Sequence, residues 1–270
     1  MLLKESPFIC PVCRSKMFCL PSFVKCLKGH SFDFSKQGYI NLLLDNSQNK
    51  RHGDDKLMVK ARTEFLNKGF YEPLKSALCE VVGSGHKILD SGCGEGYYTE
   101  ALAHNNDVCG IDISKDAIKI AANRCKDVSF AVASIGDIPL ENGSRDVIVN
   151  VFAPDSPNEF SRVLSENGRL ITVVPMERHL YGLKLAIYNE TYLNPAVESD
   201  RDGYELLSKK ILKYCITLDC NEDIISLFKM TPYYYKTSKT DQEKLLKFDT
   251  LTTEVEFCIM EFQKSKFKGI

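Results

Sequence analysis

The sequence predicts an α/β protein in which a doubly wound, mostly parallel sheet follows a small metal-binding module. Two observations support this. Paired cysteine and histidine residues lie within the first 30 residues, and beyond residue 56 short apolar strands alternate with helical segments. Such alternation is typical of parallel sheets with right-handed crossovers. We expect a metal-binding module over 1–45, a linker over 46–56 and an α/β domain over 57–270, which suits a chain of 270 residues.

The composition is that of an ordinary soluble globular protein, and the chain is expected to be cytoplasmic because neither a membrane span nor a signal peptide is found. Hydrophobic residues make up 44% of the chain and charged residues 26%. No apolar run is long enough to span a membrane, and the N-terminus lacks the pattern of a signal peptide, so no membrane partner is expected. In a reducing compartment the eleven cysteines are expected to be metal ligands or buried thiols rather than disulfides.

Charge is divided unevenly along the chain. Residues 1–60 hold ten basic and five acidic side chains, so the segment is +5 and the remainder −6, for a total of −1. A basic N-terminal segment followed by an acidic remainder predicts that the segment binds a polyanion. The alternative is an ordinary solvated surface.

The first element is a predicted zinc site. Cys10 and Cys13 are followed, after twelve intervening residues, by Cys26 and His30. Pairs of soft ligands at this spacing suit a tetrahedral zinc ion, and four protein ligands leave no open position for catalysis. We therefore expect a structural zinc that supplies the folding energy of a small module. The alternative is a chance grouping, with Cys19 as a fifth candidate.

A polar segment and two helices come next. Residues 46–55 read NSQNKRHGDD and are typical of a linker. Helical patterns are expected over 57–65 and 73–82.

A glycine-rich loop follows the first expected strand of the α/β domain, at 88–90. Residues 87–103 read KILDSGCGEGYYTEALA, which predicts a strand, a loop and a helix from Tyr97. Glycines in such a loop let bare backbone approach a ligand. The glycines expected to bind a cofactor are Gly92, Gly94 and Gly96.

Two acids beside this loop indicate which cofactor it binds. A second strand, 108–111, ends in Asp112, which is placed to accept the hydroxyls of a ribose. A dinucleotide fingerprint would need glycine where this chain has Tyr97, which disfavours a pyridine-nucleotide oxidoreductase. The pattern G-x-G-x-G preceded by Asp90 suits a nucleoside without pyrophosphate, whose methionine ammonium needs an acceptor. The sequence therefore predicts S-adenosylmethionine, with a purely structural turn as the alternative.

The alternation of strands and helices continues to residue 174, and one more strand is expected near the end of the chain. Ser134, in the loop after the third strand, is expected beside the adenine of the cofactor. The last strand is expected to insert antiparallel, as in a doubly wound methyltransferase domain. The further elements expected are a helix at 114–124 capped by Ser114, strands at 128–132, 147–151 and 169–174, a helix at 157–164, and the last strand at 254–262.

Motifs spread over the whole chain carry a family resemblance. They are CPVC with CLKGHSFDFSKQGYINLL, RHGDD with ARTEFLNKGFYEPL, LDSGCGEGYYT, GIDISKDAIKIAA, NVFAP, ERHLYGLKLAIYNE and MTPYYY. With these motifs the chain resembles the RlmA-type large-subunit ribosomal RNA (guanine-N1)-methyltransferases, some of which confer resistance to macrolides such as tylosin. The resemblance implies a Rossmann-like class I S-adenosylmethionine-dependent methyltransferase behind a zinc module.

The resemblance also implies site residues. The family's zinc ligands fall on the four residues named above, and its cofactor contacts fall on Tyr71, Tyr98, Thr99 and His179. Tyr71 is expected to cover the methionine part, and His179 to face the pocket from beyond the fifth strand. A satisfied surface histidine is the alternative for His179.

Methyl transfer is expected to be an in-line displacement that depends mainly on alignment. Because guanine N1 carries a proton, a general base is expected, and Asp155 and Glu190 are the candidates, each with a surface acid as its alternative. The acceptor guanine must be presented from a loop of the RNA or swung out of its stack. Phe152, Tyr233 or Tyr234 could stack on it, with core packing as the alternative.

The expected partner is a hairpin of large-subunit (23S) ribosomal RNA, held through phosphates by lysines of the zinc module, with a homodimer as an option. Two rival functions stay open. One is a small-molecule methyltransferase stabilised by zinc, and the other is a non-catalytic zinc protein that binds RNA. The lysines in question are Lys16, Lys25, Lys28 and Lys36.

Overall fold

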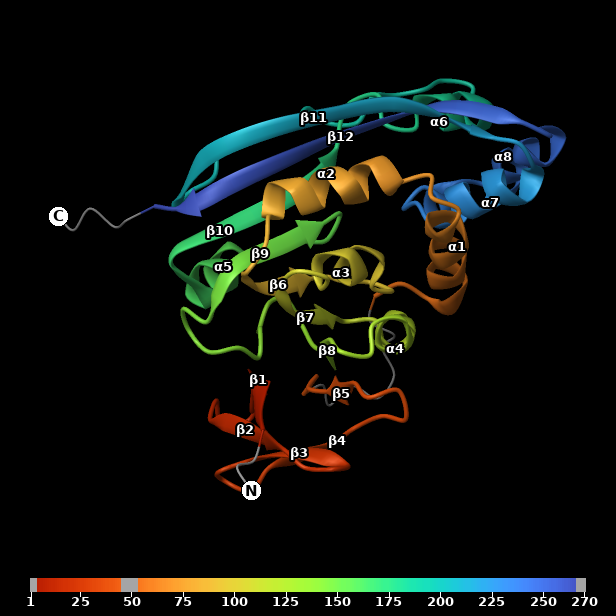
Figure 1. The fold of residues 1–270 in the computed structure, drawn as a ribbon. Coiled ribbons are helices and arrows are strands. Elements are labelled where there is room, and N and C mark those ends of the chain that lie inside the picture. Colours follow the sequence, from red (N-terminus) through yellow and green to blue (C-terminus); the bar gives the residue numbers. More distant parts are fainter. Residues whose placement is uncertain (1–3, 45–52, 266–270) are drawn as a thin grey trace.

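The computed structural model describes residues 4–44 and 53–265 and contains two sheets (Figure 1). The smaller sheet is antiparallel, with strands in the order β1-β2-β3-β4, and it forms the N-terminal module. Its strands are β1 (Glu5–Ile9), β2 (Lys16–Cys19), β3 (Phe23–Cys26) and β4 (Ser31–Asp33).

The larger sheet has eight strands in the order β11-β12-β10-β9-β6-β7-β8-β5. From β10 to β5 every neighbouring pair is parallel, and β12 runs antiparallel between β10 and β11. The predicted doubly wound fold with an inserted antiparallel strand is confirmed. The strands are β5 (Ile40–Asn41), β6 (Lys87–Ser91), β7 (Asp107–Asp112), β8 (Ser129–Val132), β9 (Arg145–Val151), β10 (Leu164–Pro175), β11 (Tyr204–Leu218) and β12 (Leu251–Lys264).

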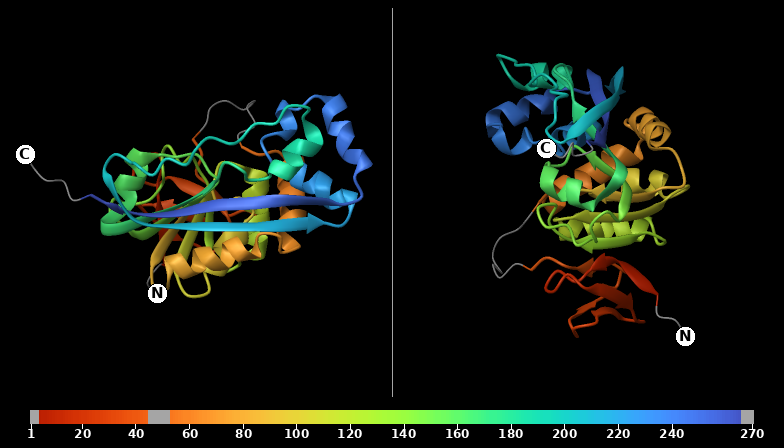
Figure 2. Two further views of the ribbon diagram at one scale, coloured as in Figure 1. Left: turned by 90° about the horizontal axis from the view of Figure 1, so that it is seen from above. Right: turned by 90° about the vertical axis from the view of Figure 1, so that its left-hand side faces the viewer.

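Helices cover both faces of the large sheet (Figure 2). Neighbouring residues of one strand point to opposite faces. Ile88 accordingly joins the core cluster that contains Leu74 of α2, whereas Leu89 joins the cluster that contains Phe160 of α5. The helices are α1 (Lys56–Asn67), α2 (Glu72–Val82), α3 (Tyr97–Leu102), α4 (Lys115–Arg124), α5 (Pro157–Val163), α6 (Tyr181–Ile187), α7 (Asn221–Lys229) and α8 (Lys239–Lys244).

Local capping explains where two of these helices begin. The Asp55 carboxylate accepts hydrogen bonds from the backbone N–H groups of Leu57 and Met58 at the start of α1. The Ser114 hydroxyl accepts one from Ala117 and caps α4, as predicted. Both caps stand beside the carboxyl end of β7, since Ser114 also donates to the Asp54 carbonyl at 2.9 Å.

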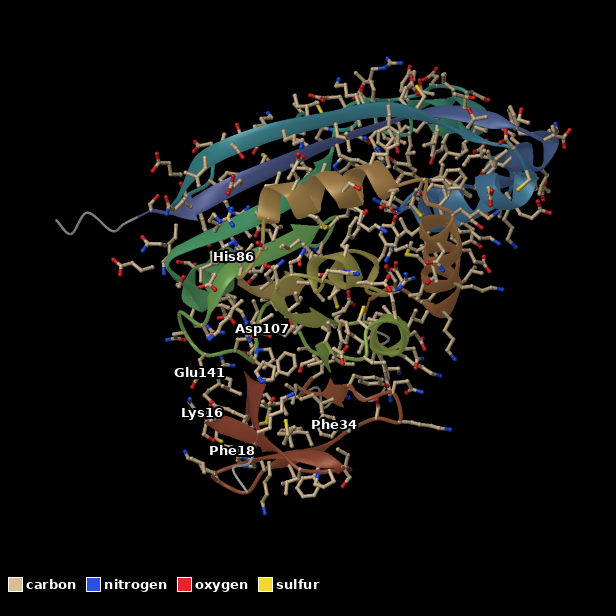
Figure 3. The ribbon with its side chains drawn as sticks, viewed as in Figure 1. Lys16, Phe18, Phe34, His86, Asp107 and Glu141 are labelled. Atoms are coloured by element: carbon tan, nitrogen blue, oxygen red, sulfur yellow. The ribbon has the colours of Figure 1, made fainter. Side chains whose placement is uncertain are left out.

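The N-terminal module packs directly on the large sheet. Strand β5 pairs in parallel with β8, and Ile9 donates a backbone hydrogen bond of 2.9 Å to the Pro139 carbonyl. Lys16 and Glu141 face each other across this junction at 3.8 Å (Figure 3). The predicted linker at 46–56 falls mostly outside the described residues, so its bounds stay a prediction.

The C-terminal part contains elements that were not predicted. Strand β11 pairs with β12 from Tyr204 to Leu218, and this long antiparallel pair lies at the end of the molecule opposite the module (Figure 1). Helices α6, α7 and α8 were also not predicted. Among residues 4–44 and 53–265, no helix combines the length and apolarity needed to cross a membrane.

Candidate functional site

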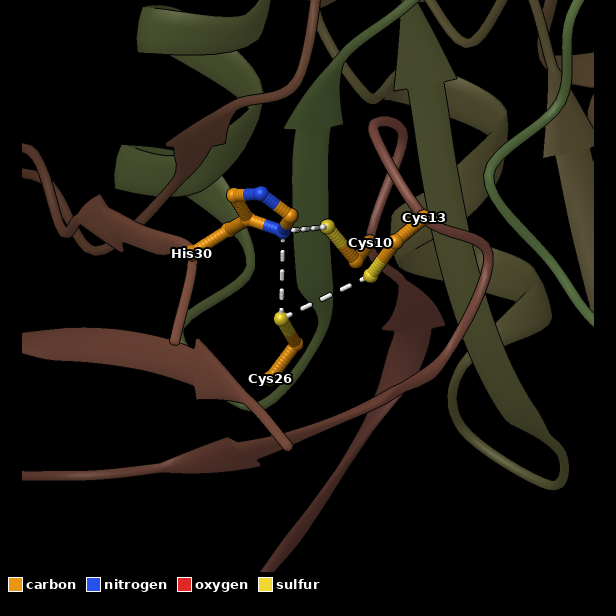
Figure 4. A group of neighbouring side chains, drawn as sticks. All are labelled: Cys10, Cys13, Cys26 and His30. Atoms are coloured by element: carbon orange, nitrogen blue, oxygen red, sulfur yellow. Dashed lines mark hydrogen bonds between the residues drawn. The ribbon is translucent and has the colours of Figure 1, made fainter. Parts of the chain in front are cut away.

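Four side chains of the N-terminal module converge on one point (Figure 4). The sulfur atoms of Cys10 and Cys26 lie 3.5 and 3.4 Å from Nδ1 of His30, and the sulfurs of Cys13 and Cys26 are 3.7 Å apart. All four ligand atoms lie within 4.8 Å of one another, and Cys19 is not part of the group.

These separations are those of ligands around a tetrahedral zinc ion. Bonds of about 2.3 Å to sulfur and 2.0–2.1 Å to nitrogen place two sulfurs about 3.8 Å apart, and a sulfur and a nitrogen about 3.5 Å apart. The three separations of 3.4–3.7 Å therefore match those that zinc requires, and the residue types fit a zinc ion. Three thiolates and one imidazole complete the coordination sphere, so the ion would stabilise the fold of the module and take no part in catalysis.

A cavity of about 640 Å³ opens at the carboxyl ends of the central strands. Loops after β6, β7, β8, β9 and β10 contribute to its walls, and so do α1 and the segment after α7. Ligands gather at this edge of doubly wound sheets because the chain reverses direction there. Most of the predicted cofactor residues line the cavity: Tyr71, Asp90, Gly92, Gly94, Tyr98, Asp112, Ser134 and His179.

Two predicted cofactor residues stand behind the cavity wall. The Thr99 hydroxyl, which is fully buried, donates to the Asp90 carboxylate at 2.6 Å. Gly96 begins α3 at a φ of +83°, where an added Cβ would come within 3.0 Å of the Ala121 side chain on α4. Thr99 therefore orients an acid, and Gly96 lets two helices approach closely.

Asp90 is a buried acid at the end of β6. Its side chain is 2% exposed. Burial raises the pKa of Asp90 to about 7, and the carboxyls of Asp112 and Glu95 add to the rise while the hydrogen bond from Thr99 opposes it. A cationic ligand group beside Asp90 would favour its ionised form.

Asp112 holds the glycine loop in place. Its carboxylate accepts backbone hydrogen bonds from Gly94 at 2.9 Å and from Ser114 at 2.7 Å, and burial raises its pKa. Each carboxylate oxygen keeps a second lone pair for a ligand hydroxyl. Gly92 cannot be replaced easily, because a Cβ there would lie 2.4 Å from the Cβ of Ala153.

Three buried polar atoms on the cavity wall have no hydrogen-bond partner in the described protein: the hydroxyls of Tyr71 and Tyr98, and Oε1 of Glu95. Buried polar atoms are rarely left unpaired, so these atoms indicate a polar ligand. The ammonium and carboxylate of a methionine moiety, and the hydroxyls of a ribose, offer such partners.

His179 lies in the cavity wall as a neutral imidazole. Its Nδ1 accepts the backbone N–H of Glu256 at 3.3 Å, so the proton resides on Nε2. Burial, and then the charge of Lys184, lower its pKa to about 3. The side chain is 8% exposed and its ring lies 4.7 Å from that of Phe257, so it is not a surface histidine.

An ion pair that was not predicted forms part of the cavity wall on the side of α1. Arg62 donates to the Asp54 carboxylate at 2.5 Å, and both residues line the cavity together with Glu95. The only signal in the sequence was the neighbouring motifs RHGDD and ARTEFLN, whose acid and arginine lie eight residues apart. The fold brings them over the glycine loop.

The two candidate bases lie away from the cavity wall. Asp155 forms an ion pair with Arg201, and Glu190 is exposed in the segment after α6. Neither is among the lining residues. Of the aromatic candidates, Phe152 and Tyr233 line the cavity, whereas Tyr234 packs edge-on against Phe228.

Comparison with known proteins agrees with both parts of the molecule. The model described as "RlmA, N-terminal" matches residues 8–51, and the model of a methyltransferase domain matches 83–247. Among solved structures, YcgJ of Bacillus subtilis superposes with a TM-score of 0.50 at 15% identity, covering 71% of this chain and 98% of that one. This last similarity concerns the fold alone.

Two relatives resemble the chain in sequence. YxjB of Bacillus subtilis, which is provisionally named a 23S rRNA (guanine-N(1)-)-methyltransferase, is 35% identical over 262 residues, 90% of this chain and 91% of that protein. The 23S rRNA (guanine(748)-N(1))-methyltransferase of Streptomyces fradiae is 35% identical over 181 residues, 63% of this chain and 64% of that protein. The chain therefore belongs to the RlmA-type 23S rRNA (guanine-N1)-methyltransferase family, with a zinc ribbon in front of an S-adenosylmethionine-dependent methyltransferase domain.

Proposed function

We propose that the protein transfers a methyl group from S-adenosylmethionine to N1 of a guanine in a hairpin loop of 23S rRNA. One observation carries this proposal: a Cys3His cluster and a donor cavity occur in the same chain. This chain also matches YxjB over 90% of its own length. Neither feature alone would point to an RNA substrate.

The donor is expected to lie along the glycine loop. Asp112 would accept the ribose hydroxyls, Ser134 would lie beside the adenine, and Asp90 would face the ammonium. The hydroxyls of Tyr71 and Tyr98, which have no partner among the residues that the structure describes, would bind the methionine carboxylate. The sulfonium is already activated, so the protein has mainly to align donor and acceptor and to exclude water.

Removal of the N1 proton is the step that requires a base. Asp155 directly follows Pro154, a lining residue, but its ion pair with Arg201 must open before it can reach the cavity. Glu190 would require a larger movement of the segment after α6. We keep both as candidates, and Asp155→Asn and Glu190→Gln test them through the pH dependence of methylation.

Residues 4–44 are proposed to hold the RNA. The exposed side chains of Lys25, Lys28 and Lys36 are available for phosphates, whereas Lys16 is engaged by Glu5 at 2.7 Å and by Glu141. Because phosphate contacts release counterions, methylation should weaken steeply as salt rises. The optional homodimer can be measured by sedimentation of the full chain.

Cofactor affinity is expected to increase with pH. A cationic donor binds the ionised form of Asp90, and in the free protein that form predominates only above a pKa of about 7. The dissociation constant should therefore fall about tenfold from pH 6 to pH 8, with release of a proton. Calorimetry in buffers of different ionisation enthalpy measures both effects.

The matched variant is Asp90→Asn, which removes the charge but keeps the shape. It should bind the cofactor more weakly and with little pH dependence. Because burial raises the pKa of Asp90 to about 7, its protonated form stabilises the folded state at low pH, and this contribution is lost as pH rises through 7. At pH 8 the folded wild type holds a buried charge that Asp90→Asn lacks. The variant should therefore melt at a higher temperature than the wild type at pH 8. An unchanged pH profile in Asp90→Asn would contradict this role.

The function itself is tested with labelled S-adenosylmethionine and 23S rRNA that lacks the modification. A methyl group mapped to guanine N1 supports the proposal. A product on a small molecule, with rates that do not depend on salt, supports the first rival function. Binding of rRNA without consumption of cofactor supports the non-catalytic one.

A further inference from the structure

Phe152 occupies a backbone conformation that phenylalanine rarely adopts. It directly follows β9 and has a φ of +54°, and its N–H is fixed by a hydrogen bond of 3.1 Å to the Val173 carbonyl. In the described chain only Arg14 and Leu180 share this left-handed conformation among residues other than glycine. Such strain persists where neighbouring structure imposes it, and it concentrates at functional sites.

The strain presents an apolar ring to the cavity. Phe152 is 44% exposed, whereas Tyr71 and Tyr97, which also line the cavity, are 3% and 4% exposed. It is the one exposed aromatic side chain among the cavity-lining residues that the structure describes. Its ring lies 5.1 Å from that of Phe257, in a tilted arrangement.

The turn that carries Phe152 is braced beside the donor loop. The Asn150 side chain donates to the Pro154 carbonyl at 2.8 Å and closes the turn. The following residue, Ala153, lies so close to Gly92 that no side chain fits between them. Phe152 is therefore held next to the glycine loop, where an acceptor has to meet the methyl group.

We propose that Phe152 is the platform on which the acceptor guanine of the hairpin loop stacks during methyl transfer. An exposed ring on a strained backbone is unfavourable in the free protein, and a purine face would cover it. Stacking on a phenyl ring accepts any base, so Phe152 would hold the guanine while other groups select it. This inference rests on the proposed function.

The test compares Phe152→Leu with Phe152→Tyr in single-turnover methylation of 23S rRNA. Loss of base stacking is expected to reduce kcat/KM for RNA about 10- to 100-fold in Phe152→Leu, while Phe152→Tyr stays within about threefold of the wild type. The dissociation constant for S-adenosylmethionine should change less than about threefold in both. Leu246→Ala, at an exposed apolar side chain outside the cavity lining, is the control and should retain full activity.

A second pair separates the ring from the backbone. Phe152→Gly and Phe152→Ala both lack the ring, but only glycine accepts a φ of +54° without strain. Phe152→Gly should therefore melt at a higher temperature than Phe152→Ala, while both lose methylation to the same degree.

Three outcomes would overturn the inference. One is full methylation by Phe152→Leu or Phe152→Gly, and another is an equal loss of activity in Phe152→Tyr. The third is a loss of cofactor affinity that matches the loss of rate, which would make Phe152 a wall of the donor site. If wild-type protein fails to methylate 23S rRNA, the proposed function is wrong instead.

Discussion

Replacing both Cys10 and Cys13 with serine is expected to abolish methylation of 23S rRNA while leaving the affinity for S-adenosylmethionine within about threefold. Serine is a poor zinc ligand, and a structural zinc ion contributes about 10 kcal/mol or more to the folding of small modules. Among residues 4–44 and 53–265, those that line the donor cavity all belong to 53–233, and none comes from the N-terminal module. We therefore expect the N-terminal module to unfold, while the residues that line the cavity keep their arrangement.

Zinc content, calorimetry with the cofactor and methylation of rRNA measure the three parts of this prediction. Cys19→Ser is the matched control, because Cys19 lies in the same module but outside the cluster. It should retain zinc and activity. Full RNA methylation by the double variant without zinc would show that the module does not hold the RNA.

Asp112→Ala is expected to weaken cofactor binding at least about 100-fold. The substitution removes the proposed acceptor of the ribose hydroxyls and also leaves the N–H groups of Gly94 and Ser114 without their present acceptor. Hydrogen bonds to a charged group contribute about 1.5–3 kcal/mol each, and 1.4 kcal/mol corresponds to a tenfold change in affinity. Calorimetry with S-adenosylhomocysteine, the demethylated product, measures the loss directly.

Asp127→Ala is the control for this variant, since Asp127 is an exposed acid in the turn before β8. It should bind the cofactor as the wild type does. Binding by Asp112→Ala within about threefold of the wild type would mean that the ribose lies elsewhere.

The α/β domain could largely be predicted because its signals are local. Apolar strands such as 88–90 and 108–111 alternate with helices, and the strand ends carry glycines or acids. Strand β11 lacked a clear signal, because much of its length is exposed at the edge of the sheet and its lysines interrupt the apolar residues. Only its pairing with β12, more than thirty residues later in the chain, makes it a strand.

The candidate site likewise contains residues that could be predicted from the sequence and residues that could not. The zinc ligands, the glycine loop and Asp112 could be named from spacing alone. The ion pair of Arg62 with Asp54, and the hydrogen bond from Thr99 to Asp90, depend on how segments meet in space. The positions of Asp155 and Glu190 away from the cavity wall could not be inferred from their places in the sequence either.

The chemical groups of this protein and their order can be inferred from local sequence patterns, because metal-ligand spacing and strand–loop–helix periodicity act over a few residues. The environments of these groups depend on the folded chain. Burial sets the pKa of Asp90 and keeps His179 neutral, and the packing of β9 against β10 holds Phe152 in its strained conformation. These properties depend on neighbours distant in the chain, so they arise only when the sheet has formed.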